Sequence, residues 1–366
     1  MRKVLEQPFE YLRKRDGSAF DAEVYENWYK ARAFVLHALK DIAFKPDDET
    51  HLQVVVHGDD SLMLSVVRQV ALSAHYINYD EDNEGSAKRN CTVITIVSNH
   101  PETVENELMK EEYLNNLVRY CNTVSFDIVW EVVSEWNGES GKNVIVKEIK
   151  KEDIESFCKS VPQNEIRYID TRKAVYTSRM YELGRLIDSL PAENIHDARR
   201  YALALDTYQF ELLRKKPDKL VNEDKWNENQ AKVKGGLSNV FCSDCFELRA
   251  NSIALCRKNK RQKENELWEE NNEALSKSEH ARWAVEKLVM GFRPFSKEER
   301  MKDEELAFDK KLRKQYRDGL KNNAEVMAHI DICSYADLRR INPEDMKYDS
   351  FLMLAIPAIL KKVNQK

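Results

Sequence analysis

One segment of the chain gathers residue types that could form a polar and aromatic pocket. It reads Glu-His-Ala-Arg-Trp at 279–283 and Gly-Phe-Arg at 291–293. On a helix, His280, Trp283 and Glu286 lie on one face, because residues three and four positions apart are neighbours. A tryptophan can stack on a planar ring or cover a cation, and Arg293 could bind an anion. The spacing would suit a tryptophan in a hydrophobic core equally well.

A second candidate is the turn His-Gly-Asp-Asp-Ser at 57–61, after a predicted strand. A dinucleotide fingerprint needs three glycines so that the backbone can approach a pyrophosphate at a helix N-terminus, and only Gly58 is present. Asp59 and Asp60 would repel a diphosphate and suit a helix N-cap. We expect a structural turn here. Gly58, Asp59, Asp60 and Ser61 remain a weak nucleotide-binding set, because crevice geometry does not depend on glycines alone.

Two further patterns favour structural roles. Cys242 and Cys245 form a lone Cys-x-x-Cys, with Cys256 as the nearest other thiol and no histidine close in sequence. A tetrahedral zinc site needs four ligands, so no metal is assigned. The basic run at 310–317 follows the acidic run at 303–305, and on helices such charges pair or face solvent. A nucleic-acid patch is therefore disfavoured.

The elements that would position these residues follow from hydrophobic spacing. The run Leu-Gln-Val-Val-Val-His at 52–57 is typical of a strand buried on both faces of a parallel sheet. Apolar residues at helical intervals predict helices on both sides of it. The predicted strands are 52–57, 75–79, 92–97, 123–129 and 144–146, and the predicted helices are 21–44, 62–72, 101–119, 181–190, 195–213 and 264–290.

Alternating strands and helices followed by helices alone predict an α/β plus α protein. We expect a helical segment over 1–47, a mostly parallel Rossmann-like sheet domain over 48–175, a helical connecting region over 176–264 and a mainly helical domain over 265–366.

Composition limits the class of protein. The 366 residues carry 58 Lys and Arg and 63 Asp and Glu, for a net charge of −5, which disfavours a strongly basic DNA-binding protein. The longest apolar runs fall short of the roughly 20 residues needed to span a bilayer, and the first residues lack the apolar stretch of a secretory signal. Seven scattered cysteines suit a reducing compartment. These features predict a cytoplasmic protein with free thiols and no transmembrane segment.

Three short motifs in series resemble the ryanodine-receptor repeat (RyR) domain in its bacterial form. The first is the 279–293 segment described above. The second, His-Ile-Asp-Ile-Cys-Ser-Tyr-Ala-Asp-Leu at 329–338, resembles the family's His-x-Asp-Leu-x-Pro-Tyr-x-x-Leu. The third combines Lys-Tyr-Asp at 347–349 with Ile-Pro-Ala-Ile-Leu at 356–360. The chain departs from the family at Phe292, at Ser334 and in a long charged insert over 296–328.

The resemblance implies a non-enzymatic domain that senses nucleotide-derived ligands. It also implies an N-terminal companion similar to the nucleotide-binding domain of Trk/Kef potassium-transport regulators. On this basis the expected ligand is nucleotide-like, with a nucleotide or dinucleotide as the only cofactor considered. The ligand-binding residues that it implies are His280, Trp283, Glu286, Arg293, Tyr335 and Asp349.

Three hypotheses follow. The first is a cytosolic sensor or regulatory protein that binds a small ligand or a protein partner through its RyR-like domain, as a monomer or a homo-oligomer. The second is an enzyme acting on a nucleotide, with His57, Asp59 or Asp60 as acid–base groups. The third is an interaction scaffold whose aromatic pocket holds a peptide of another chain.

Overall fold

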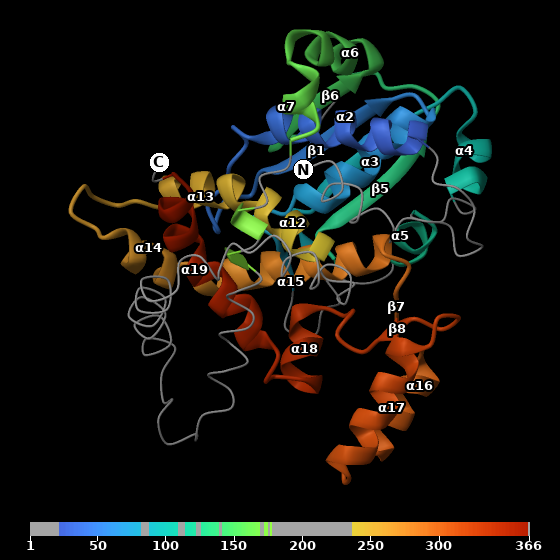
Figure 1. Ribbon diagram of the computed structural model, residues 1–366, viewed down its shortest axis with the longest axis vertical. Helices are drawn as coiled ribbons and strands as arrows, with labels where there is room; N and C mark the ends of the chain where they lie inside the picture. The colour runs from blue at the N-terminus through green and yellow to red at the C-terminus, as the bar shows by residue number, and fades with distance from the viewer. Residues whose placement is uncertain are drawn as a thin grey trace.

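The computed structural model of the chain describes residues 22–81, 88–108, 114–121, 126–138, 141–168, 172–174, 176–177 and 236–364. Figure 1 shows a sheet with helices around it in the upper part of the molecule, a layer of helices below, and a helical arm that projects downward. The predicted helices at 181–190 and 195–213 lie outside the described residues.

A four-stranded parallel sheet is the centre of the α/β unit. Its order is β5-β4-β1-β6, with all neighbours parallel. Its strands are β1 (His51–His57), β4 (Thr92–Val97), β5 (Ile128–Val133) and β6 (Val144–Lys150). Val54, Val55 and Val56 have no exposed surface, and β1 lies between β4 and β6. The predicted buried central strand and the α/β plus α class are confirmed.

Three strand predictions need correction. The strand predicted at 123–129 lies later in the chain: positions 123–125 are outside the described residues, positions 126 and 127 are not in a strand, and β5 covers Ile128–Val133. Residues 75–79 form no strand but a turn before the short β2 (Asp80–Glu81), which pairs with β3 (Lys88–Arg89). The predicted weak strand at 144–146 extends over the seven residues of β6. This strand lies at an edge of the sheet, where Lys147 and Glu148 tolerate partial exposure, so charges interrupt its hydrophobic pattern.

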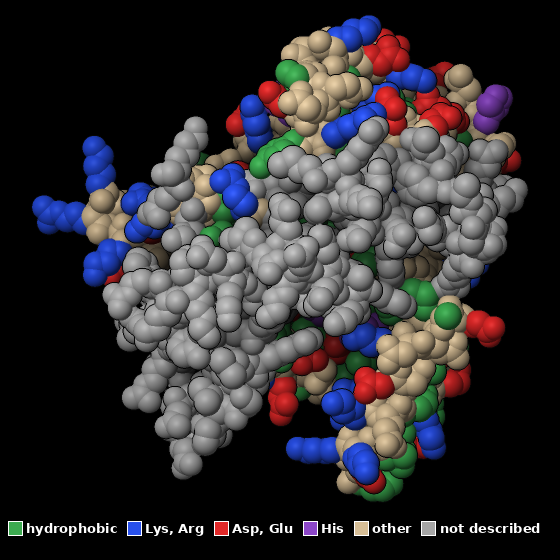
Figure 2. All heavy atoms as spheres, viewed as in Figure 1, with side chains coloured by type: hydrophobic (Ala, Val, Ile, Leu, Met, Phe, Trp, Pro, Cys, Tyr) green, Lys and Arg blue, Asp and Glu red, His purple; other side chains and the backbone are tan. Residues whose placement is uncertain are grey.

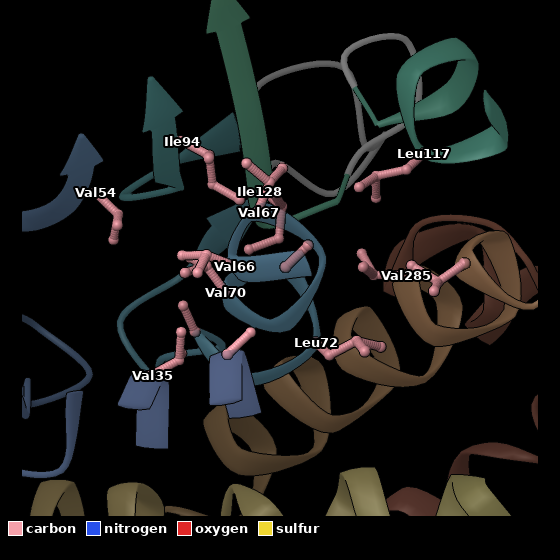
Figure 3. Packing of buried hydrophobic residues seen from close by; sticks show 14 of the residues in the cluster. Val35, Val54, Val66, Val67, Val70, Leu72, Ile94, Leu117, Ile128 and Val285 are labelled. Atoms are coloured by element: carbon pink, nitrogen blue, oxygen red, sulfur yellow. The ribbon is translucent and has the colours of Figure 1, made fainter. Parts of the chain in front are cut away.

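Helix α3 (Ser61–Ser73) is buried on nearly every side. Its hydrophobic residues pack against the sheet, against α2 (Ala22–Leu39) and against α15 (Asn272–Val289). Figure 3 shows Val66, Val67 and Val70 of α3 among Val35 of α2 and Ile94 and Ile128 of the sheet. Because α3 is covered on nearly every side, polar side chains of the helix such as Arg68 and Gln69 are buried as well.

The C-terminal helices share this hydrophobic core. Val285 and Leu288 of α15 belong to the same cluster of buried residues as Val54 and Ile94 of the sheet. The predicted helix at 264–290 is divided at Asn271 into α14 and α15. The remaining helices are α4 (Pro101–Leu108), α5 (Asn115–Tyr120), α6 (Lys151–Ser160), α7 (Gln163–Ile166), α12 (Gly236–Asp244), α13 (Phe246–Leu255), α14 (Glu264–Glu270), α18 (Tyr335–Ile341) and α19 (Met346–Asn364).

The charged insert forms a helical arm made of α16 (Lys297–Glu305) and α17 (Lys310–Asn322). Two short parallel strands, β7 (Arg293–Pro294) and β8 (Ala328–His329), join its base to the rest of the molecule. Arg313 and Arg317 of α17 both bind the carboxylate of Asp303 in α16, which holds the two helices together. In the described part of the chain, no helix is both long and apolar enough to cross a membrane.

A buried hydrogen-bonded pair links the end of α3 to the beginning of β5. His75 Nδ1 lies 2.8 Å from both carboxylate oxygens of Asp127, and His75 Nε2 lies 2.7 Å from the carbonyl oxygen of Ala71. Both ring nitrogens are therefore engaged in hydrogen bonds, one with a carboxyl group and one with a backbone carbonyl. Neither side chain has more than 2% exposed surface. This pair explains why the 75–79 segment turns instead of entering the sheet.

We predict that His75→Ala lowers the free energy of unfolding by about 1–3 kcal/mol, because it leaves the buried Asp127 carboxyl group without this hydrogen-bond partner. Urea denaturation measures the loss, and Asp127→Asn in the same background should recover part of it. The exposed His100→Ala is the matched control. A loss no larger than that of the control would contradict a stabilising role of the His75–Asp127 contact.

Candidate functional site

Three segments that are distant in the sequence meet around the ring of His280. His280 Nε2 lies 3.0 Å from the carbonyl oxygen of Cys333, and Nδ1 lies 3.4 Å from Oδ2 of Asp349. The ring of Tyr335 is 5.7 Å away, centre to centre. Burial by itself lowers the pKa of His280, but Asp349 and Cys333 outweigh it and raise the pKa well above its ordinary value. His280 is therefore a buried cation that ties α15 to α18 and α19.

Trp283 lies directly beside this cation. Its ring stacks on His280 with centroids 6.0 Å apart and an interplanar angle of 23°, and the edge of His329 meets it at 5.0 Å. The ammonium of Lys287 lies 5.5 Å from the ring centre, a cation–π distance. His280 and His329 are buried, whereas Trp283 is only partly buried. We call these four residues the aromatic cluster; it combines a fixed, partly accessible indole with an ammonium.

His329 is neutral in this setting. Its burial and the nearby ammonium groups of Lys321 and Lys287 hold its pKa well below the ordinary value. The ring can therefore donate one hydrogen bond and accept another. Its Nδ1 already accepts from the backbone N–H of Asp331 at 3.3 Å.

Local sequence explains how the cluster is positioned. His280, Trp283 and Lys287 lie three and four residues apart on α15, which places them on one face. Gly291 follows the helix with φ of +84°, and Phe292 N–H donates to the carbonyl of Lys287, so a left-handed glycine ends the helix. Ser334 caps α18, with its hydroxyl accepting from Asp337 N–H at 3.0 Å. Ser334 is thus an N-cap.

The structure does not bring all the expected ligand residues together. Tyr335 and Asp349 lie against His280, but Glu286 is fully buried on another face of α15 and accepts from Arg282 and Lys287. Arg293 makes two 2.7 Å hydrogen bonds to the carboxylate of Glu299 at the start of α16. Neither Glu286 nor Arg293 belongs to the aromatic cluster.

Helix α15 buries a second set of charges. Arg282 donates to Glu279 at 2.8 and 2.9 Å and to Glu286 at 2.5 Å, and Arg249 Nη1 of α13 lies 2.8 Å from Glu279. These residues have no exposed surface. Burial raises the pKa of Glu279, but Arg282 and Arg249 overcome this and lower it to about 2. The Glu and Arg of the Glu-His-Ala-Arg-Trp segment therefore form a structural ion network.

The Cys-x-x-Cys pair lies beside this network. Both thiols are buried, and burial raises the pKa of Cys245 to about 12 and that of Cys242 well above its ordinary value. Neither is a reactive thiolate at neutral pH. All seven cysteines are free. Within the described ranges, no group of three or more His, Cys, Asp or Glu side chains could hold a metal ion.

The turn after β1 is occupied by its own side chains. Asp60 accepts from the N–H groups of Leu62 and Met63 at 3.0 Å, which fills the anion position at the start of α3. Lys151 donates to the same carboxylate at 2.6 Å. Burial raises the pKa of Asp60, but these hydrogen bonds outweigh it and lower the pKa, so Asp60 stays ionised and cannot act as a general acid.

The neighbouring polar groups of this turn are also engaged. Asp59 accepts from the Ser98 hydroxyl at 2.5 Å, and His57 lies 3.0 Å from the Glu148 carboxylate. Ser61 accepts from Asn27 at 2.8 Å. Gly58 has φ of +118° and leads directly into α3, so only a glycine fits here without strain. The weak nucleotide-binding set and the proposed acid–base groups are thus held in structural contacts.

Two carboxyl groups face each other near the aromatic cluster. Asn342 donates to Asp331 at 3.2 Å and to Asp345 at 2.5 Å. Burial and, next, the charge of Asp331 raise the pKa of Asp345 to about 6. Like charges this close favour one shared proton.

Comparison of the chain with protein-family models, with curated proteins and with solved structures gave no match. The site therefore has to be interpreted from its own geometry.

Sequence reasoning missed two members of the aromatic cluster. His329 lies in the second motif but was not singled out, and Lys287 was not considered although it follows Trp283 at a helical interval. The helical spacing could have found Lys287, because residues i and i+4 are neighbours. Nothing local could have found the contact of His329 with Trp283, which depends on the β7–β8 pairing.

We predict that Asp345→Asn stabilises the protein at pH 7 by roughly 1 kcal/mol, because it removes a carboxylate that folding makes harder to ionise. The folded pKa of about 6 exceeds the ordinary value of 3.8. The folded state therefore binds more protons in this range, and wild-type stability should fall as the pH rises from 4 to 6. Denaturation curves across this range should show a smaller fall for the variant. Parallel curves for the two proteins would contradict the assignment.

Proposed function

We propose that the chain is a cytoplasmic, non-enzymatic sensor or regulatory protein that binds a small nucleotide-derived ligand at the aromatic cluster. On this proposal residues 265–366 form a RyR-like domain, and the parallel-sheet unit is a Rossmann-like companion of the Trk/Kef type. The observation that carries the proposal is the partly exposed Trp283 ring, held against the buried cation His280 at 6.0 Å.

A planar base and a phosphate fit this arrangement. A base can stack on an accessible indole, which contributes roughly 1–3 kcal/mol for a nucleobase. Lys287 lies over the ring while it donates to Glu286, and the exposed Lys321 is near His329, so two ammonium groups border the position of an anion. His280 and Asp349 would hold the Trp283 ring in place, because both are buried and bound to each other.

Binding without chemistry agrees with the state of the ionisable groups. Two ionisable groups of α15 are committed to partners: His280 to Asp349 and Cys333, and Glu279 to Arg282. A general acid or base must be able to exchange a proton with substrate. These groups support a fixed binding surface instead.

We predict that one of NAD, ADP-ribose or a cyclic nucleotide stabilises the protein, by about 2.7 kcal/mol at 100 times its dissociation constant. Trp283→Ala should weaken binding by roughly 1–3 kcal/mol. Lys287→Met should also weaken it, and Arg293→Met, a cation outside the cluster, is the matched control. Thermal shift and calorimetric titration measure both effects. If Trp283→Ala instead costs about 3–5 kcal/mol of stability and binding is unchanged, Trp283 is only a core residue.

A second candidate function, self-association, is favoured by the end of the arm. Phe308 is 84% exposed, Met301 56% and Leu312 44%. Figure 2 shows hydrophobic and basic side chains together at the lower end of the arm. Lys310 and Lys311 of α17 are exposed close to these residues, and Glu304 of α16 is exposed as well. Two arms related by a two-fold axis would bury the apolar side chains and set lysines against acids.

We predict that the full chain forms a concentration-dependent dimer and that Phe308→Ser with Leu312→Ser abolishes it. The change in the free energy of unfolding of the monomer should stay within about 0.5 kcal/mol, since both residues are on the surface. Light scattering over a range of concentrations measures the dimer. Leu255→Ser, which alters an exposed leucine of α13, is the control. A wild-type chain that stays monomeric at all concentrations would refute this function.

A further inference from the structure

A pocket of about 410 Å³ lies at the seam between the α/β unit and the C-terminal helices, away from the aromatic cluster. Helices α2 and α7 line it from one side and α12 and α13 from the other, and Figure 1 shows these pairs facing each other. Its volume falls in the range of small-ligand sites, which often occur between structural units.

Three cations and three anions line the pocket, and two ion pairs lie among them: Arg32, Lys40, Lys173, Glu165, Asp244 and Glu247. Arg32 Nε donates to Asp244 Oδ2 at 2.9 Å, and Arg32 Nη2 donates to the other oxygen of the same carboxylate. Lys173 Nζ donates to Glu247. Burial raises the pKa of Asp244, and the positive charges of Arg32 and Lys173 oppose this rise, so the two ion pairs are close enough to interact. With three cations and three anions, the lining carries no net formal charge.

Each ion pair leaves polar capacity unused. Among the described residues, Arg32 Nη1 has no hydrogen-bond partner, and Lys173 uses only one of its three N–H donors. Glu247 likewise has a second carboxylate oxygen without a hydrogen bond in the described part of the chain. The floor can therefore serve a carboxylate and an ammonium at the same time.

The wall above this floor is apolar. It is formed by Ala33, Leu36 and Leu39 of α2 together with Phe157, Val161 and Ile166. A ligand with a large hydrocarbon or aromatic group would bury that group here. An ion of one sign would bring an uncompensated charge to a floor that is already balanced, whereas a zwitterion would not.

We propose that the pocket binds a small zwitterion with an apolar side chain, of the free α-amino acid class. Its carboxylate accepts from Arg32 Nη1 and Lys173, its ammonium donates to Glu247, and its side chain packs against Leu36 and Phe157. The ligand would touch both α2 and α13. This site is separate from the aromatic cluster and does not rest on the function proposed there.

The test is calorimetric titration of the full chain with L-phenylalanine as the probe. Two analogues, 3-phenylpropionate and 2-phenylethylamine, each lack one of the two charges. L-phenylalanine should bind in a saturable one-to-one manner, and each analogue should bind about tenfold more weakly or worse. An analogue that binds as tightly as L-phenylalanine would refute the zwitterion assignment. Absence of saturable L-phenylalanine binding at millimolar concentration would refute the site.

Variants locate the binding. Lys173→Met should weaken L-phenylalanine binding about tenfold or more, and Lys302→Met, which removes a surface lysine of the arm, should leave it unchanged. Ala33→Phe should fill the pocket and abolish binding. If its melting curve shows that it does not fold, Leu36→Trp fills the same space from the same helix. Binding that survives Lys173→Met and a folded pocket-filling variant would overturn the proposal.

Discussion

The buried charges of α15 are the constraint on which the rest of the structure depends. Glu279, Arg282 and Glu286 have no exposed surface, and His280 is nearly as deeply buried. An unpaired charge in such a place would cost several kcal/mol, so each must meet an opposite charge or a polar acceptor. Arg249 of α13 supplies the opposite charge for Glu279, and Asp349 of α19 supplies it for His280. The charges of α15 thereby dictate which helices pack on it and in what register.

This constraint also separates two roles on one helix. The face with Glu279, Arg282 and Glu286 meets α13 through an ion pair with Arg249, whereas the face with His280 and Trp283 meets the segments at 329–335 and 349. Because the buried network and the hydrophobic contacts of Val285 hold α15 against α3 and α5 (Figure 3), the indole is presented on a rigid support. Rigid support is what a stacking platform needs, since a mobile ring would lose entropy on binding.

Charge pairing has opposite results at two places in the α/β unit: it fills the turn after β1, and it leaves hydrogen-bonding groups unused in the pocket beside α2. At the carboxyl end of β1, Asp60 satisfies the N-terminus of α3 and Lys151 satisfies Asp60, so little polar capacity remains for a ligand. At the seam between α2 and α12, Arg32 and Asp244 pair but leave donors unused beside an apolar wall. The turn after β1, where the strand order predicts a ligand, is filled by its own side chains. The pocket lies instead between the α/β unit and the C-terminal helices.

The sequence by itself determined the elements whose burial is periodic. The β-branched run at 54–56 had to become a buried strand, and the spacing of α15 placed His280 with Trp283, because both patterns depend on neighbours within a few residues. Tertiary structure alone decided that residues 75–79 turn, because His75 pairs with Asp127 from a distant strand. It also buried Glu279 and Arg282, which on an isolated helix would have faced water. The spacing of apolar residues shows which face of an element is buried. The partner of a buried charge lies far away in the sequence, so only the packing of the helices determines which residue it is.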